Sequence, residues 1–226
     1  FSGNTLLWQQ KQEPDDFPKE VKKVFKKYPA IQAAMISSVG LFDEKYISVL
    51  SVFAEVHLLS HSTKIPFKNS YATPQTLGMD RVALATAAFY QNSGANTLVI
   101  DAGTCITYDM MNDYGEYLGG AISPGLRMRY SALHEYTAKL PLLEPRDILD
   151  IIGNSTNASI HSGVLNGICR EIDGVIDQYQ SRFKDLTVIL TGGDAQILSK
   201  RLKNTIFANS NFLLEGLNYL LEYNKR

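Results

Sequence analysis

Residues 97–104 read TLVIDAGT and residues 187–195 read TVILTGGDA, and these two stretches decide the fold class. In each stretch, an apolar run rich in β-branched residues leads into glycine, threonine and aspartate. Such a run is typical of a strand buried in a sheet that is covered on both faces. The polar residues that follow would lie at the carboxyl end of the strand, where α/β proteins bind ligands. The similar strand ends predict two lobes around a cleft, residues 1–94 and residues 95–226.

Helical and extended patterns alternate along the rest of the chain. In residues 19–28, apolar side chains recur at helical spacing, and the lysines between them form the solvated face of the helix. By the same reasoning we expect helices at residues 43–52, 77–90 and 213–223, strands at residues 31–39, 56–59 and 105–111, a turn and strand at residues 115–120, a loop at residues 65–76, and a turn leading into a strand at residues 1–9. This alternation predicts an α/β fold with a mostly parallel, covered sheet.

A long helix is predicted to start at Ser155. Its apolar residues, from Ile160 to Tyr179, lie on one stripe at helical spacing, and two small residues, Gly163 and Gly167, lie beside that stripe. Small residues four positions apart allow another helix to approach closely. Because the apolar stripe exceeds what one small lobe needs, we expect this helix to form the interface of a homodimer.

The composition is that of a folded globular protein without an electrostatic preference for polyanions. Of 226 residues, 45% are apolar, and 22 basic and 23 acidic residues give a formal net charge of −1. This balance gives no case for binding nucleic acid or a membrane surface, so the expected partners are small molecules or proteins. No apolar run approaches the roughly 20 residues of a membrane-spanning helix. We therefore expect a cytoplasmic protein.

Cysteine and histidine usage does not indicate a metal centre. Cys105 and Cys169 are too few and too far apart in sequence for a disulfide scaffold or a zinc site, and we expect both to be reduced core residues. The histidines have none of the spacings of metal ligands, and we expect structural or surface roles for all of them, at positions His57, His61, His134 and His161.

Both glycine-containing strand ends hold residue types suited to phosphate or cation binding. Asp101, Gly103 and Thr104 place a carboxylate, exposed backbone N–H groups and a hydroxyl together. A tight turn that needs Gly103 for backbone freedom is the alternative interpretation. In the second stretch, Gly192–Gly193 would let a flat ligand approach the backbone, whereas Asp194 could simply cap the helix that follows.

A third motif joins an acid to a base. Residues 78–81 read Gly-Met-Asp-Arg and place Asp80 next to Arg81 at the start of a predicted helix. A carboxylate there can accept the proton of a hydroxyl group, and a guanidinium can hold an anionic group through its fork of donors. The alternative is a surface salt pair between these two side chains.

Four motifs occur in a distinctive order and spacing, at residues 71–81, 101–104, 119–125 and 191–195. The series resembles the type III pantothenate kinases, and the resemblance runs from about Phe1 to the C-terminus. It implies a duplicated ribonuclease H-like lobe, as in actin and hexokinase, and a homodimer. It also implies ATP-dependent phosphorylation of pantothenate to 4′-phosphopantothenate, the first step of coenzyme A biosynthesis. The implied cofactors are Mg²⁺ with ATP and a monovalent cation, K⁺ or NH₄⁺.

The resemblance assigns roles to individual residues. Asp80 matches the general base, and Asp101 matches the ligand of the monovalent cation. The residues that match contacts to pantothenate are Tyr71, Gly78, Met79, Asp80, Arg81 and, reaching across the dimer interface, Thr156. The residues that match the ATP side are Gly103, Thr104, Gly192 and Gly193, within a stretch that continues to Ala195.

One family motif has no match in this sequence. The family carries Asp-x-Gly-Asn-Thr or Ser at the end of its first strand, with a basic residue soon after, to help hold magnesium and phosphates. Gly3-Asn4-Thr5 is similar, but Phe1-Ser2 replaces the acid and the base is missing, so we place this segment in the next strand. We expect residues ahead of Phe1 to supply the missing strand and loop, between residues 1–9 and residues 31–39.

Other functions stay open on the sequence. A catalytically inactive relative that regulates or binds would explain the missing motif, but not the retained Asp80, Asp101 and Thr104. A sugar or acetate kinase of the same fold would not explain residues 71–81. An α/β domain without any shared site would leave the order of the four motifs unexplained.

Overall fold

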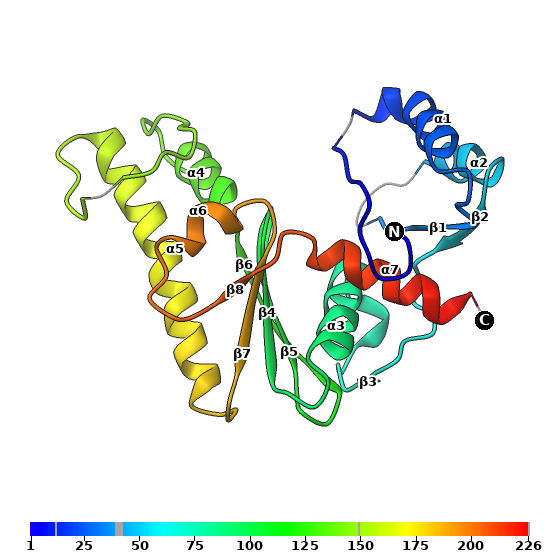
Figure 1. Cartoon of the computed structure of the whole chain (residues 1–226). Helices are drawn as coiled ribbons and strands as arrows, with labels where there is room; N and C mark the ends of the chain where they lie inside the picture. The colour runs from blue at the N-terminus through cyan, green and yellow to red at the C-terminus, as the bar shows by residue number, and fades with distance from the viewer. Residues whose placement is uncertain (12, 39–42, 149, 226) are drawn as a thin grey trace.

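A six-stranded sheet forms the centre of the computed structural model, which describes residues 1–11, 13–38, 43–148 and 150–225 (Figure 1). The strand order is β3-β6-β5-β4-β7-β8, and the strands are β3 (Lys68–Asn69), β4 (Thr97–Ala102), β5 (Cys105–Met111), β6 (Glu116–Pro124), β7 (Thr187–Thr191) and β8 (Phe207–Ala208). β4 is parallel to β7, β7 to β8 and β3 to β6, whereas β5 is antiparallel to both of its neighbours. The sheet is therefore mixed.

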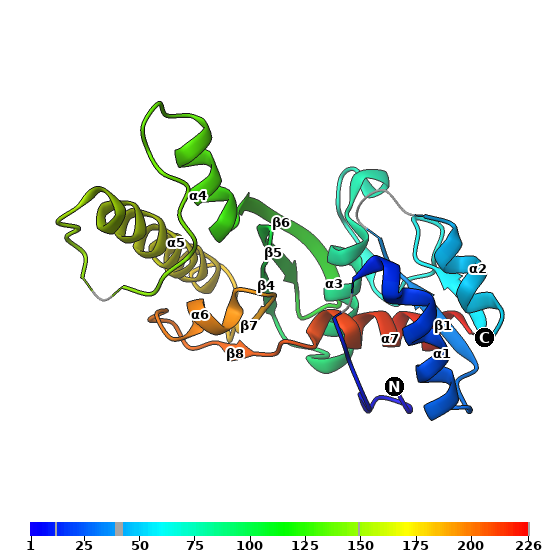
Figure 2. The same cartoon turned by 90° about the horizontal axis from the view of Figure 1, so that it is seen from above.

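Helices cover both faces of this sheet. Figure 2 shows α5 (Thr156–Gln180), α4 (Leu126–Glu135) and the short α6 (Ala195–Ser199) on one side, and α3 (Met79–Gln91) and α7 (Phe212–Asn224) on the other. Successive side chains of a strand point to opposite faces. Accordingly, Leu98 and Ile100 of β4 belong to the core beneath α5, and Val99 between them belongs to the core beneath α3.

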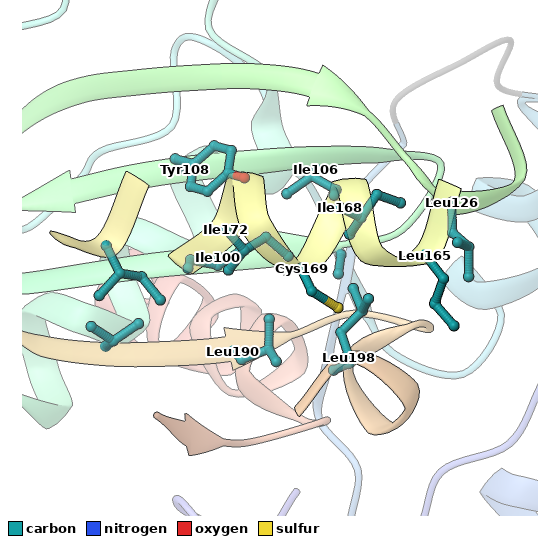
Figure 3. Close-up of a cluster of buried hydrophobic side chains, with 14 of the residues drawn as sticks. Ile100, Ile106, Tyr108, Leu126, Leu165, Ile168, Cys169, Ile172, Leu190 and Leu198 are labelled. Carbon is teal, nitrogen blue, oxygen red and sulfur yellow. The ribbon is translucent and has the colours of Figure 1, made fainter. Parts of the chain in front are cut away.

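The core on the α5 side is apolar. Figure 3 shows Ile168 and Ile172 of α5 over Ile100 of β4 and Leu190 of β7, and all four are fully buried. Full burial of such a side chain contributes about 1.5–3 kcal/mol relative to exposure. The apolar stripe predicted for this helix therefore packs on the sheet of its own chain.

A smaller unit precedes the main sheet. β1 (Ala33–Ile36) pairs in parallel with β2 (Glu55–Leu58). α1 (Phe17–Lys27), which follows a 3-10 turn at Pro14–Asp16, packs on α2 (Lys45–Ser51), and α2 contacts β2. α7 contacts β1 as well as α3, so the C-terminal helix lies between this unit and the main sheet (Figures 1 and 2).

Most of the predicted elements are present. The helices predicted at residues 19–28, 43–52, 77–90 and 213–223 are α1, α2, α3 and α7. The long helix begins where expected, because the Ser155 hydroxyl caps it and accepts a hydrogen bond from the Ala158 N–H at 3.3 Å. The predicted α/β fold is confirmed.

Several expectations were wrong in detail. Ser2 and Thr5 close the predicted turn with backbone hydrogen bonds of 2.9 and 3.1 Å, but no strand follows it at residues 6–9. The predicted strand at residues 31–39 is shorter, and its last residue, Val39, lies outside the described residues. The prediction of a mostly parallel sheet is confirmed except at β5, which alone runs opposite to the other five strands, because short turns at residues 103–104 and 112–115 return the chain directly.

Two loop predictions also need adjustment. The stretch at residues 65–76 contains the short strand β3 and a 3-10 helix at Pro74–Thr76. The strand predicted within residues 115–120 continues to Pro124 as β6.

Among the described residues, no helix combines the length and apolar composition needed to cross a membrane.

The contact between α3 and α7 depends on one glycine. A Cβ at Gly216 of α7 would overlap with the backbone carbonyl group of Ala83 in α3, so the two helix backbones approach closely there. The α3 surface at this contact is built from small residues, with Ala83 and Ala87 fully buried. The Gly-Met-Asp-Arg motif lies at the start of α3. Gly216 therefore allows α7 to pack closely against the helix that carries this motif.

We predict that Gly216→Ala lowers the free energy of unfolding by about 1–3 kcal/mol, because the added methyl group meets backbone atoms rather than a movable side chain. Gly174→Ala in α5 is the matched control, since nothing lies within 4 Å of its Cβ position. There we expect a gain of about 0.5–1 kcal/mol from helix propensity. Urea unfolding of both variants measures the difference, and equal effects would contradict the predicted overlap.

Candidate active site

Parallel pairing brings the two glycine-containing strand ends together. Asp101 of β4 lies opposite Thr191 of β7, so residues 101–104 and residues 191–195 leave the sheet at the same edge. The Asp194 N–H donates to the Ala102 carbonyl oxygen at 2.9 Å, which ties one loop to the other. The strand ends predicted to bind ligands are therefore adjacent.

Gly192 is required where these loops meet. Its φ is +95°, a conformation that favours glycine, and a Cβ there would overlap with the Asp101 carboxylate and the Ala102 carbonyl group. Gly193 is exposed beside it, as is Thr104 of the first loop. The alternative role of Asp194 as a helix cap is not supported, because it occupies the cap position of α6 but its side chain makes no capping hydrogen bond.

The motif at residues 119–125 supports both neighbouring segments. The Gly125 N–H donates to the Thr104 carbonyl oxygen at 3.1 Å, and a Cβ at Gly125 would overlap with the carbonyl oxygens of Gly103 and Thr104. At the other end of the motif, Gly119 has a φ of +95°, and its Cβ position lies 3.0 Å from the ring of Tyr71. Together with Gly192, these glycines connect all four sequence motifs.

Asp101 lies in a negatively charged and partly buried environment. Burial, followed by the charges of Asp80 and Asp109, raises the pKa of the Asp101 carboxyl group from 3.8 to about 6. The effect of Asp80 shows that the motif at residues 78–81 and the strand-end loops act on one another electrostatically. A carboxylate held in this way gains stability from a nearby cation.

Asp80 lies in the first turn of α3. Its Oδ1 accepts a hydrogen bond from the Arg81 N–H at 2.8 Å, and a Cβ at Gly78 would overlap with this carboxylate. Gly78 therefore allows the carboxylate to fold back over the start of the helix, where unpaired N–H groups favour negative charge. Met79 lies between them as the first residue of the helix.

Arg81 is buried and forms its ion pair with a residue that we had not singled out. Its Nε donates to Oδ1 of Asp109 at 2.7 Å, and its Cζ lies 5.7 Å from the centre of the Tyr71 ring. The alternative of a surface salt pair between Asp80 and Arg81 is therefore wrong. Burial lowers the pKa of the guanidinium, but the charge of Asp109, the Tyr117 side chain and hydrogen bonds to Asp109 and Tyr71 together outweigh this and hold the pKa above its ordinary value.

Asp109 is the functional candidate that sequence reasoning missed. It lies between Tyr108 and Met110 in a mostly apolar strand and is only 1% exposed. Burial raises the pKa of its carboxyl group, while Arg81, Tyr117 and Thr107 act in the opposite sense and favour the ionised form. An acid inside an apolar strand pattern was the available signal, because a buried charge requires a partner.

Thr156 does not join this cluster within one chain. It is exposed at the start of α5, and both views place that end of the helix away from α3. Two hollows in the described surface are lined by neither Asp80 nor Asp101. One, of about 480 Å³, lies between β6 and α5, and the other, of about 190 Å³, lies beside residues 111–115. The described residues contain no cluster of three His, Cys, Asp or Glu side chains able to hold a metal ion alone.

Comparison with known proteins places the chain among kinases. The family model for type III pantothenate kinase matches residues 3–178. The type III pantothenate kinase of Christiangramia forsetii is 52% identical over 225 residues, covering 100% of this chain and 93% of that protein. That of Flavobacterium johnsoniae is 50% identical over 223 residues, covering 99% of this chain and 91% of that protein.

One solved structure shares the fold at low sequence identity. A Campylobacter jejuni protein described as a conserved Baf family transcriptional activator aligns with a TM-score of 0.56 and 22% identity. The alignment covers 90% of this chain and 88% of that one. This likeness concerns the α/β fold alone.

The raised pKa of Asp101 predicts a measurable dependence of stability on pH. Because the pKa is about 6 in the folded protein and 3.8 ordinarily, ionising Asp101 costs stability as the pH rises from about 4 to 7. Asp101→Asn should therefore raise the free energy of unfolding by about 1–3 kcal/mol at pH 7 and change little below pH 4. Urea unfolding across this range, with the exposed Asp113→Asn as control, measures it. A variant that is less stable at pH 7 would contradict the assignment.

Proposed function

The chain belongs to the type III pantothenate kinase family, and from that premise we propose which of its residues carry out the reaction. It is a kinase that phosphorylates pantothenate with ATP in coenzyme A biosynthesis. Family membership also removes the sugar and acetate kinases from consideration. The observation that carries the residue assignments is the close approach of the motifs at glycine backbone, with Gly125 against Thr104 and Gly192 against Asp101. The charge of Asp80, which raises the pKa of Asp101, agrees with it.

Asp80 acts as the general base in this proposal. As the pantothenate oxygen bonds to the γ-phosphorus of ATP and the bond from that phosphorus to the ADP oxygen breaks, the Asp80 carboxylate takes the proton from the hydroxyl group of pantothenate. Support comes from its place in the first turn of α3, where Gly78 leaves room for the carboxylate. Tyr71, Gly78, Met79 and Arg81 bind pantothenate around it, and the guanidinium attracts the anionic acceptor.

The strand-end loops bind ATP. Thr104 contributes its hydroxyl and backbone N–H group to the phosphates. Gly103 lies beside it in the same site, with its own N–H donated to the Cys105 carbonyl oxygen at 2.9 Å. Gly192 and Gly193 let the nucleotide approach the backbone. The proposal is supported by the hydrogen bond between Asp194 and Ala102, which aligns the two loops. Phosphoryl transfer needs mainly positioning and charge neutralisation, so loops fixed by backbone contacts suit it.

Cations complete the charge balance of the site. Mg²⁺ enters with ATP, since this ion is usually bound through one or two carboxylates and the phosphates of the substrate. Asp101 is proposed to hold the monovalent cation, K⁺ or NH₄⁺. The raised pKa of its carboxyl group fits this role, because a bound cation would offset the burial and the repulsion from Asp80 and Asp109.

The working unit is proposed to be a homodimer of two-lobed subunits. Residues 1–94 and 95–226 form the lobes, and α7 links them through its contacts with α3 and β1. Thr156 would complete the pantothenate site of the neighbouring subunit, which accounts for its position away from Asp80. Gly163 and Gly167 have open space around their Cβ positions, which suits close approach of a partner helix.

We predict that Asp80→Asn lowers kcat by about 10²–10⁴-fold, because it removes the proton acceptor and keeps the shape. The KM for pantothenate should change only modestly. Coupled detection of ADP release, with magnesium and potassium present, measures both constants. Asp113→Asn, at an exposed turn, is the control. Turnover of Asp80→Asn near the wild-type rate would remove Asp80 from the role of general base.

Asp101→Ala should weaken activation by the monovalent cation. The variant removes the proposed ligand, so raising the K⁺ or NH₄⁺ concentration should increase the rate much less than in the wild type. The same ADP assay, repeated across cation concentrations at constant ionic strength, gives the answer. If the cation dependence is unchanged, the ion is held by other groups.

We predict a dimer by light scattering, and activity that depends on both subunits. Thr156→Val and Asp80→Asn should each be poorly active, but mixing them with subunit exchange should form one intact site, with Asp80 from one chain and Thr156 from the other. Recovery of activity on mixing is the expected result. A monomer, or no recovery in proven mixed dimers, would refute the shared site.

A further inference from the structure

Asp109 is a buried carboxylate on the face of β5 that lies beneath α3. Its Oδ1 accepts hydrogen bonds from Arg81 Nε and from the Tyr117 hydroxyl, both at 2.7 Å. Its Oδ2 accepts one from the Thr107 hydroxyl at 2.9 Å. The donors come from α3, β6 and β5, so a single carboxylate joins the start of the helix to two strands of the sheet.

This arrangement is costly unless each partner is in place. Asp109 is 1% exposed and Arg81 is 5% exposed, so both charges are removed from water. Burying an ion pair costs desolvation that is recovered only with good geometry and further hydrogen bonds, and removing one partner leaves an uncompensated charge. The network therefore has one well-defined arrangement of the guanidinium.

The same contacts restrict which atoms of Arg81 can meet a ligand. Nε is occupied by Asp109, Nη2 lies 3.5 Å from the Tyr108 carbonyl oxygen, and the Tyr71 ring lies 5.7 Å from Cζ. The guanidinium is thus fixed from the sheet and from the Tyr71 side. The backbone N–H of Arg81 also donates to the Asp80 carboxylate at 2.8 Å, so Asp80 and Arg81 are positioned together.

We propose that Asp109 is a positioning residue for the pantothenate site, which holds the Arg81 guanidinium in the orientation that receives the substrate. The inference rests on the proposed role of Arg81 as a pantothenate contact. Asp109 itself touches no substrate. Its effect passes through Arg81, so it should govern the KM for pantothenate and leave the nucleotide side of the site unaffected.

Steady-state kinetics of Asp109→Asn test this directly. The variant keeps the shape but removes the charge, and we expect the KM for pantothenate to rise about tenfold or more from misplacement of Arg81, with the KM for ATP unchanged. The matched control is Asp173→Asn, a buried carboxylate on α5 that accepts from the backbone N–H groups of Lys203 and Asn204 at 3.0 and 3.1 Å. This control should alter the melting temperature but neither KM.

A double-mutant cycle distinguishes positioning from general destabilisation. If Asp109 acts through Arg81, the double variant with Asp109→Asn and Arg81→Lys should have the pantothenate KM of Arg81→Lys alone. Independent, multiplying effects would overturn the proposal. If Arg81→Lys raises the pantothenate KM but Asp109→Asn leaves it unchanged, the positioning role of Asp109 is overturned and the role of Arg81 as a substrate contact stands. No effect of Arg81→Lys would instead remove Arg81 from the substrate contacts.

A second variant covers the case in which Asp109→Asn does not fold. Asp109→Glu keeps the charge, but its longer side chain displaces the guanidinium from its place between β5 and Tyr71. The expected result is again a raised KM for pantothenate and an unchanged KM for ATP in protein that melts cooperatively. A wild-type pantothenate KM in the folded Glu variant would contradict the positioning role.

Discussion

Parallel pairing of β4 with β7 is the constraint on which the rest of the site depends. It aligns Asp101 with Thr191, so two buried strands end together and their loops lie at one edge of the sheet. The strands are held in this register by apolar side chains on both faces, with Ile100 packing beneath α5 and Val99 beneath α3. A loss of this register would separate the proposed nucleotide loops, whatever residues they carried.

The negative charges gathered at this edge of the sheet lower the stability of the folded protein. Asp80 and Asp109 raise the pKa of Asp101, which is already unfavourably buried. Functional sites commonly hold such charge clusters at the expense of stability. The neighbouring Arg81 offsets only part of this charge, because its Nε is committed to Asp109. Cations and the substrates themselves would supply the rest, which suits an enzyme that transfers a phosphoryl group between two anionic molecules.

Patterns within short segments were read correctly from the sequence. The apolar runs before Asp101 and Gly192 are strands, and Ser155 caps the long helix, because each of these features depends on neighbouring residues alone. The contact between the glycine motifs could be anticipated from their shared place after strands, but not the overlap that makes Gly192 and Gly125 necessary. That requirement arises from backbone atoms of a different segment.

Features that depend on distant pairing were missed. The partner of Arg81 lies 28 positions away in another element, so proximity in sequence suggested Asp80 instead. The strand expected at residues 6–9 is absent because an extended pattern becomes a strand only beside a pairing partner. The apolar stripe of α5 was attributed to a partner subunit, yet Ile168 and Ile172 pack on the sheet of the same chain. A buried stripe by itself does not say which surface covers it.

In this account, one site holds both substrates side by side. Amide hydrogen exchange, measured with pantothenate alone and with an ATP analogue alone, tests this most directly. Amides in the first turn of α3 lack helical partners, so their exchange is sensitive to a bound ligand. Pantothenate should slow exchange in residues 78–81, and a non-hydrolysable ATP analogue should slow it in residues 102–104 and 192–195. Protection of neither set by its own ligand, in protein shown to bind both, would contradict the account.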